Sequence, residues 1–195
     1  MRSSRSARAI YDSRDPSGVP SAGFRVGAHG DLAAAVWGLD DARWFVVGGQ
    51  LLGATDFLGG RRVFALSLEG SSIFPVAGGE VPFDQTIDAG GQGPMQGFRP
   101  GQLRGGSAIA LTLAYEWPVW LFLNARIYAT LGNAFGFGFQ GFAVERLRLS
   151  FGIALRPPTP GEHPFELGVG AGTDPFDDGA SISTFRFFVG TRNDL

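Results

Sequence analysis

The clearest pattern along the chain is an alternation of large apolar and small residues with a period of two. From Ser107 to Trp117 one phase reads Ile, Leu, Leu, Tyr and Trp, and the other reads Ala, Ala, Thr, Ala and Glu. The segments Leu149–Arg156 and Phe165–Gly172 repeat the pattern. Successive side chains of a strand point to opposite faces, so this period predicts β-strands.

Less regular alternation predicts further strands along the chain. They lie at Ala22–Val36, Arg43–Thr55, Arg62–Phe74, Asn124–Ala134 and Ser181–Thr191, with a weaker candidate at Arg8–Asp15. Turn-forming residues separate them at Gly38–Asp41, Gly59–Gly60, Arg156–Gly161 and Asp177–Gly179. We therefore expect eight strands, or nine with the weakest, in a single domain of residues 1–195 whose residues 1–7 are disordered. Several strands have the nine to eleven residues that a tilted strand needs to cross a bilayer.

The composition of the two phases indicates which face meets which solvent. In a soluble barrel the large apolar side chains fill the interior, whereas here few charges interrupt the large apolar phase and the other phase is mostly Gly, Ala, Ser and Thr. This arrangement favours lipid outside and a small, polar lumen inside, because a charge on the lipid face costs roughly 2–4 kcal/mol at the midplane. A soluble sandwich is the alternative that alternation alone leaves open. We interpret five aromatic residues near strand ends as an interfacial girdle: Trp44, Tyr115, Trp117, Trp120 and Phe135.

Composition supports an all-β chain and excludes several functions. The chain has 31 Gly, 18 Phe, 17% charged residues and no Cys, and each Gly costs about 1 kcal/mol relative to Ala inside a helix. The lack of Cys excludes disulfides and Cys-based metal sites. The net charge of -2 gives no reason to expect nucleic acid as a partner. No apolar run reaches the 18 residues of a transmembrane helix.

Candidate catalytic or metal-binding groups are few. His29 and His163 are the only histidines and no carboxylate pair recurs near both, so we expect no catalytic residue, cofactor or metal. The segment Gly136–Gly141 imitates a Gly-rich nucleotide loop, but no helix pattern follows it and we interpret it as a loop between strands. Asp12 and Asp15 are best explained as turn residues. Six charged residues fall on the small-residue phase, where we interpret them as a satisfied lumenal network with a polar path as the alternative: Arg25, Glu69, Glu116, Arg126, Glu166 and Arg186.

One long stretch, Pro75 to Gly106, lacks strand character, and loops of this length inside a compact domain are usually functional or disordered. It carries a Pro-Phe segment, then Gly-Gly, then Gln96-Gly97-Phe98-Arg99. Later segments continue in the same order, at Leu113–Trp117, Ile127–Phe135 and Leu147–Leu155. Together with the turn that begins at Tyr11, these motifs resemble the C-terminal half of the BamA/TamA-type outer-membrane assembly barrels, the bacterial surface antigen family.

The resemblance implies a transmembrane antiparallel β-barrel, or part of one, in the bacterial outer membrane, with the long loop folded into the lumen. It implies a function in inserting or exporting other outer-membrane proteins, without catalytic residues. The implied partners are outer-membrane lipid and unfolded outer-membrane or secreted proteins. The implied loop motif is Gln96, Gly97, Phe98 and Arg99, and the lumen residues expected to contact it are Glu116, Thr130 and Gly132.

Departures from the family pattern shape the remaining expectations. The family's loop-tip Arg is Gln96 here, and the lumenal Asp that it pairs with falls at Thr130, so we hypothesise that Glu116 pairs with Arg99 or Arg104 instead. No docking repeats, secretion signal or first barrel half are visible, and the chain ends on a Leu where the family has an aromatic residue. We therefore expect a piece of a longer barrel that stays open and needs its missing half or a second copy, rather than one that closes alone. A small structural or pore-forming barrel, or the membrane anchor of a larger protein, is the alternative function.

Overall fold

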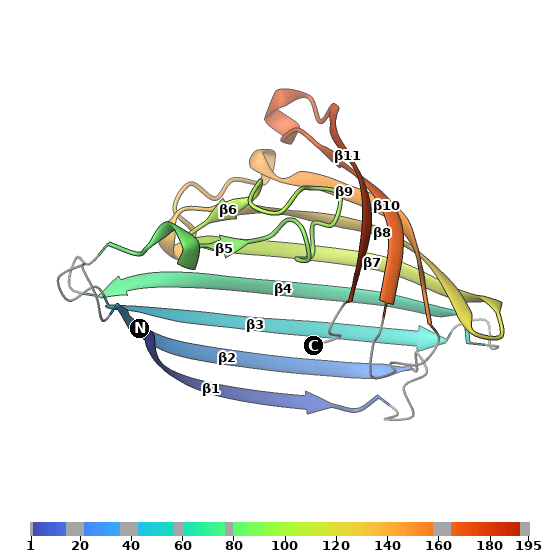
Figure 1. The fold of residues 1–195 in the computed structure, drawn as a ribbon, viewed down its shortest axis with the longest axis horizontal. Coiled ribbons are helices and arrows are strands. Elements are labelled where there is room, and N and C mark those ends of the chain that lie inside the picture. Colours follow the sequence, from blue (N-terminus) through green and yellow to red (C-terminus); the bar gives the residue numbers. More distant parts are fainter. Residues whose placement is uncertain are drawn as a thin grey trace.

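Nine long strands form one antiparallel sheet in the computed structural model, which describes residues 2–14, 22–35, 43–56, 61–76, 80–157 and 165–191. The sheet order follows the chain (Figure 1). The long strands are β1 (Arg2–Asp12), β2 (Gly23–Ala35), β3 (Arg43–Asp56), β4 (Val63–Val76), β7 (Ser107–Trp120), β8 (Leu123–Phe135), β9 (Arg148–Arg156), β10 (Phe165–Thr173) and β11 (Ile182–Thr191). Short strands β5 (Ile87–Asp88) and β6 (Arg104–Gly105) pair within the long loop, and 3₁₀ turns lie at η1 (Phe83–Gln85), η2 (Phe137–Phe139), η3 (Val144–Arg146) and η4 (Phe176–Asp178). The all-β expectation is confirmed. None of the helical segments in these ranges has the length and apolar character to cross a membrane.

The period-two pattern located the strands closely. Eight of the nine long strands begin and end within three residues of the predicted bounds. The exception is β1, which starts at Arg2, so the expectation of disorder is wrong for residues 2–7. These residues pair with β2 from Arg2↔Ala35 to Ala7↔Gly30. Strands pair through backbone groups, whatever the side chains. Because this run of Ser, Arg and Ala has no alternation of apolar residues, the sequence pattern did not predict the strand.

Some sequence interpretations concern residues outside the described ranges. They are Asp15, His163, the turns at Gly38–Asp41 and Gly59–Gly60, most of Arg156–Gly161, and the end of the chain at Leu195.

The two faces of the sheet differ as the alternation predicted. Across four adjacent strands the register places Leu51, Leu68, Leu111 and Leu131 side by side on one face. We call this the outer face. Its large apolar side chains are exposed, as at Leu113, which is 55% exposed. The other, inner face carries small and polar residues that are mostly buried, and the six charged residues predicted for the lumen belong to it.

Two of the five expected girdle residues are wrong. Trp44 lies on the inner face, packed with Ala33 and Ile73 and only 2% exposed. Phe135 has the same phase on β8 as the outer-face residue Leu131, but it is buried against Phe142, with ring centroids 5.2 Å apart. For Trp44, position near a strand end was misleading because the phase sets the face. Phe135 has the outer phase, and the loop that follows its strand covers it. The other three aromatics keep the outer phase or its exposed end, and there Tyr115 stacks on Trp117 at 5.2 Å.

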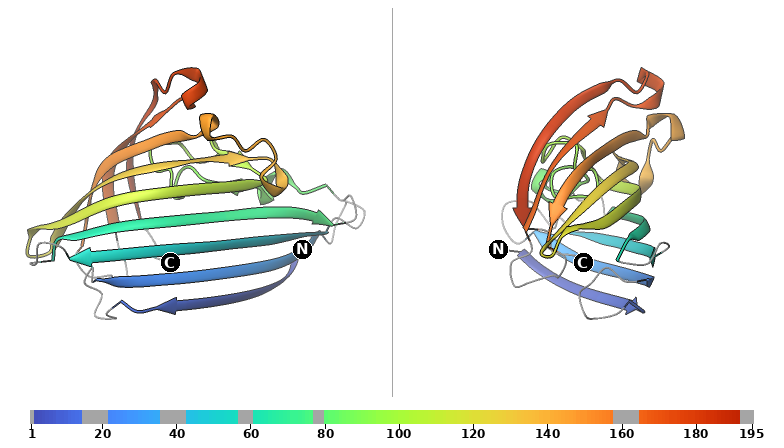
Figure 2. Two further views of the ribbon diagram at one scale, coloured as in Figure 1. Left: turned by 180° about the vertical axis from the view of Figure 1, so that it is seen from behind. Right: turned by 90° about the vertical axis from the view of Figure 1, so that its right-hand side faces the viewer.

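The sheet is open at both edges. β1 and β11 are its edge strands and do not pair with each other in the described structure, so the expectation of a partial barrel is confirmed. Every neighbouring pair is antiparallel. With nine strands, β1 and β11 therefore run in the same direction. Seen from the end, the sheet curls, and the long loop lies within the curve (Figure 2).

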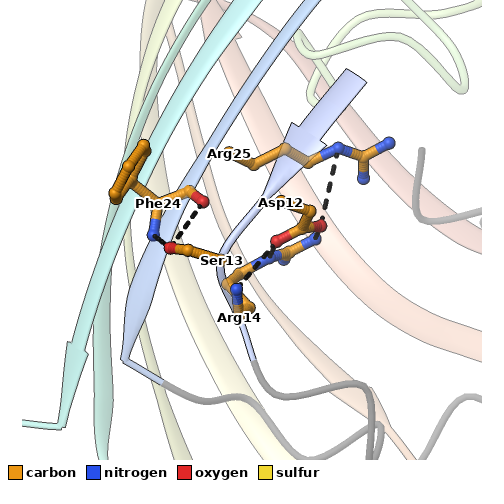
Figure 3. A network of polar contacts seen from close by, with 5 residues as sticks. All are labelled: Asp12, Ser13, Arg14, Phe24 and Arg25. Carbon is orange, nitrogen blue, oxygen red and sulfur yellow. Dashed lines mark hydrogen bonds and ion pairs between the residues drawn. The ribbon is translucent and has the colours of Figure 1, made fainter.

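The turn after β1 is fastened by side chains of both strands (Figure 3). The Asp12 carboxylate accepts hydrogen bonds from the backbone N–H and the guanidinium of Arg14, at 2.7–3.1 Å, and lies 3.8 Å from Arg25 Nε. The Ser13 hydroxyl accepts the Phe24 N–H at 2.9 Å. Asp12 is thus the last residue of β1, and its carboxylate holds the turn that follows.

The segment Gly136–Gly141 joins two strands, as expected, and its backbone is held by hydroxyl groups. Ser72 and Ser107 lie opposite each other with their oxygens 2.8 Å apart. Ser72 accepts the N–H of Gly138 at 3.1 Å and Ser107 accepts the N–H of Phe139 at 2.9 Å. The donors that a nucleotide phosphate would need are therefore used within the protein.

Substitution of Leu113 by Arg tests the assignment of the faces. We expect a loss of about 2–4 kcal/mol in the free energy of unfolding, because the charge would face hydrocarbon. Urea unfolding in lipid vesicles, followed by tryptophan fluorescence, measures this loss. Gln50→Arg is the matched control, since Gln50 lies half-buried on the inner face. Equal losses from both variants would contradict the assignment.

Candidate functional site

The long loop between β4 and β7 has its own small core. Ala89 N–H bonds to Leu103 O at 2.9 Å, just beyond the neck that β5 and β6 form. Met95 and Phe98 are completely buried against Ala89 and Leu103, with Ala108 of β7 beneath them. A compact loop packed by its own side chains has a defined shape that can be docked as a unit.

Asp88 holds the two arms of the loop together. Its carboxylate accepts the Gly90 N–H at 3.0 Å and the Gly101 N–H at 2.5 Å, and it lies 3.8 Å from Arg104 Nε. Gly101 has φ +80°, a conformation that favours glycine. The arms are therefore fixed by one charged acceptor, in keeping with the greater strength of hydrogen bonds to ionised groups.

The loop tip, residues 95–99, docks on the inner face of β9, β10 and β11. Gly97 donates its N–H to Ser150 Oγ at 2.8 Å and accepts the Thr184 hydroxyl at 2.9 Å. A Cβ added to Gly97 would lie 2.1 Å from Ala171 O. The backbone of the tip thus lies directly on the backbone of β10, which only glycine at this position permits.

Glycines on β10 make the matching hollow. A Cβ at Gly172 would lie 2.5 Å from the Phe98 ring, and one at Gly170 would lie 3.2 Å from Gly97 Cα. Glycine inside a strand weakens the strand and often marks the close approach of another backbone. Alternating glycines at 168, 170 and 172 were the sequence signal that could have identified β10 as the docking strand.

Gln96 of the tip reaches a buried carboxylate. Its Nε2 lies 3.5 Å from Glu166 Oε2 on β10, and Glu166 Oε1 lies 3.6 Å from Arg126 Nη1 on β8. Gln96, Glu166 and Arg126 are each less than 10% exposed. The loop tip therefore presents a neutral amide to this carboxylate, which already has a cation from the wall.

Arg186 of β11 binds the loop backbone. Its Nη1 lies 2.6 Å from Gly91 O, 3.2 Å from Gln96 O and 3.3 Å from Phe98 O. The guanidinium carbon also lies 5.5 Å from the centroid of the Phe188 ring. One cation from the wall thus gathers three carbonyl oxygens from both sides of the tip.

Among the lumen residues predicted to meet the loop, Glu116 has its polar partners elsewhere on the wall. Glu116 bonds to Asn124 at 2.8 Å and pairs with Arg156, so its predicted pairing with Arg99 or Arg104 is wrong. It lies nine residues along β7 from the loop's end, about 30 Å at the rise of a strand. Arg99 is exposed, whereas Arg104 pairs with Asp88.

Thr130 and Gly132 belong to the neighbouring part of the wall. Thr130 is fully buried and its hydroxyl contacts that of Thr112 at 2.9 Å. The nearest atoms to a Cβ at Gly132 belong to Ile109 and Ala110 of β7. Thr130 pairs in register with Ser150, which does bind the tip. The docking position is therefore shifted from β7 and β8 to the last three strands.

The docked loop leaves space over the first strands. A cavity of about 200 Å³ lies between the loop at Asp88 and Pro94 and the inner residues Arg8, Gln50 and Glu69. Within the described ranges, no three His, Cys, Asp or Glu residues gather as a metal ion would require. The site is a surface of glycines, hydroxyls and one arginine on which the chain's own long loop docks.

Gly97→Ala tests the backbone contact. We expect the loop to undock, at a cost of about 1–3 kcal/mol typical of overpacking, because the new Cβ would overlap Ala171 O. Limited proteolysis of folded protein in detergent measures loop exposure, with cleavage expected between residues 92 and 104. Gly53→Ala is the control, since nothing lies within 4 Å of a Cβ there. Unchanged resistance in Gly97→Ala would contradict the docked position.

Comparison with known proteins agrees with this architecture. Residues 1–193 match the model of the Omp85 superfamily domain. The structure is similar to the crystal structure of BamA from Haemophilus ducreyi lacking POTRA domains 1-3, with a TM-score of 0.70 and 18% sequence identity. The match covers 96% of this chain and 42% of that one, so the chain spans less than half the length of that structure. No match was found among curated proteins. The family match extends over nearly all of the sequence, and the chain belongs to the Omp85 superfamily.

Proposed function

We propose that this chain forms the loop-bearing part of an outer-membrane barrel that inserts or exports other outer-membrane proteins. One observation carries the proposal: in an Omp85 chain, the long loop is docked through Gly97 and Arg186 beside an open edge strand. A loop docked next to an unpaired edge is an arrangement suited to adding strands to that edge. Pairing of strands makes and breaks only hydrogen bonds, so the proposed work requires no catalytic residue.

The outer face supports a location in the bacterial outer membrane. Many of the large apolar residues on it are 39% exposed or more, in a sheet whose inner face is polar. Outer-membrane barrels show this alternation, apolar outside and polar inside. The lipid of that membrane is therefore the proposed solvent of the outer face.

The open edges need partners, because each unpaired backbone group in lipid costs several kcal/mol. β1 and β11 run in the same direction, so an all-antiparallel closure requires an added sheet with an odd number of strands. A second copy in the same orientation would meet β11 with a parallel strand at each seam. We therefore favour completion by strands of another sequence, from a longer form of the polypeptide or from a separate chain, over a homodimer.

An edge strand can also bind an incoming strand, by the strand addition used in other peptide-binding proteins. An exposed edge presents a row of free N–H and C=O groups. The proposed clients, unfolded outer-membrane or secreted proteins, offer the complementary row. The seam that the added strands would make with β1 or β11 is the proposed place of this exchange.

A folding assay tests the proposed function. Protein purified from membranes is reconstituted into vesicles of bacterial lipid, and an unfolded eight-stranded outer-membrane barrel is added as client. We expect the client to fold several-fold faster than in empty vesicles, because the edge supplies a template for its first strand. The heat-dependent shift of the client band on a gel measures the folded fraction.

Vesicles that contain an unrelated barrel are the control for lipid defects caused by any inserted protein. An acceleration no greater than in this control would contradict the proposal. If ion conductance were then found across the same vesicles, the pore-forming alternative would replace it.

A further inference from the structure

We propose that Arg186 is the positioning residue of the long loop, and that it couples the docked loop to the edge strand β11. In this chain the docking cation belongs to the wall and not to the loop tip. The docking contacts of Arg186 do not depend on the proposed function. Only the biological use of the coupling rests on the proposed function.

Arg186 binds carbonyl oxygens from three different residues of the loop. Its Nη1 reaches the carbonyls of Gly91, Gln96 and Phe98 within 3.3 Å. Gly91 and Phe98 are themselves joined, N–H to O, at 2.9 Å. A guanidinium stays charged and carries donors only, so carbonyl oxygens are the groups that it selects. The three contacts can form together only when the loop has its observed shape.

Gln96, the polar side chain of the loop tip, supplies little to the docking. Gln96 makes one 3.5 Å contact with Glu166, and its amide oxygen is buried without a hydrogen-bond partner among the described residues. By contrast, Arg186 and Thr184 of the same strand reach four acceptor contacts on the loop backbone. Hydrogen bonds from a charged donor are roughly twice as strong as neutral ones. The attachment on β11 therefore outweighs the contact at Gln96.

The position of these two residues creates the coupling. In the described structure β11 pairs on one side only, with β10, where Arg186 faces Gly170 in register. Strand β11 cannot leave β10 without withdrawing both Thr184 and Arg186 from the loop. Conversely, release of the loop leaves the cation of Arg186 without its three acceptors. Loop docking and retention of the edge strand thus stabilise each other.

Two measurements on the full chain in detergent test this inference. The chain has no Cys, so Met95→Cys places one thiol at a fully buried position of the docked loop. Its maleimide-labelling rate reports undocking, and amide hydrogen exchange of residues 91–98 and 182–191 reports the coupling. Neither measurement involves a client, so its result is independent of the folding assay.

In the Met95→Cys background, Arg186→Met keeps the stem over Phe188 but removes the charge and the donors. We expect labelling to accelerate roughly tenfold or more, the scale of one hydrogen bond to a charged group, and exchange to rise in both segments. Arg186→Lys restores a donating cation and should label within about threefold of the parent. Arg146→Met, in the exposed loop before β9, is the matched control and should change neither readout.

Unchanged labelling in Arg186→Met would overturn the positioning role. Faster exchange in the loop with an unchanged β11 would overturn the coupling. If Arg186→Met does not fold, Thr184→Val removes a single bond from the same strand, and a rise of several-fold in labelling is expected. Unchanged labelling and exchange in Thr184→Val would then count against the inference.

Discussion

Direct contact between two backbones, at Gly97 of the loop and Ala171 of β10, is the constraint on which the site depends. No side chain can stand between them, since a Cβ at Gly97 would lie 2.1 Å from the Ala171 oxygen. The contact requires the hollow at Gly170 and Gly172, which in turn admits the ring of Phe98. It also brings the tip's N–H and C=O within reach of hydroxyls on β9 and β11. Glycines that weaken an isolated strand therefore become, in the assembled wall, a surface complementary to a loop.

Charge is distributed around this contact in a way that explains the neutral tip. Glu166 is buried and already lies 3.6 Å from Arg126. A second cation at position 96 would give the pair an excess positive charge in a confined site, and burying a charge without its own partner is costly. Arg186 is placed instead against carbonyl dipoles, which accept a cation without carrying a full charge. This arrangement attaches the loop to the edge strand β11.

The strands and their faces could be predicted from the sequence because both depend on a local period of two. Outward leucines such as Leu111 and inward residues such as Thr112 are separated by phase alone. The docking partners depend on where a long loop returns in space, which the period does not encode. Glu116 and Thr130 were therefore predicted as its partners, whereas Ser150 and Arg186 perform that role. Trp44 is a different case, since its phase places it inside and only its position near a strand end suggested lipid.

The two edge strands of the sheet are held in place by different contacts, and the docked loop contributes to one of them. A sheet of nine antiparallel strands presents two edges of the same direction, and neither can complete the other in antiparallel pairing. The edge at β11 is retained by its ladder to β10 and, through Thr184 and Arg186, by the loop. The edge at β1 has its ladder to β2 and the turn clasp at Asp12. Because the two edges are held by different means, a change in the loop would act on β11 and leave β1 in place. That asymmetry ties the docked loop to the edge strand β11.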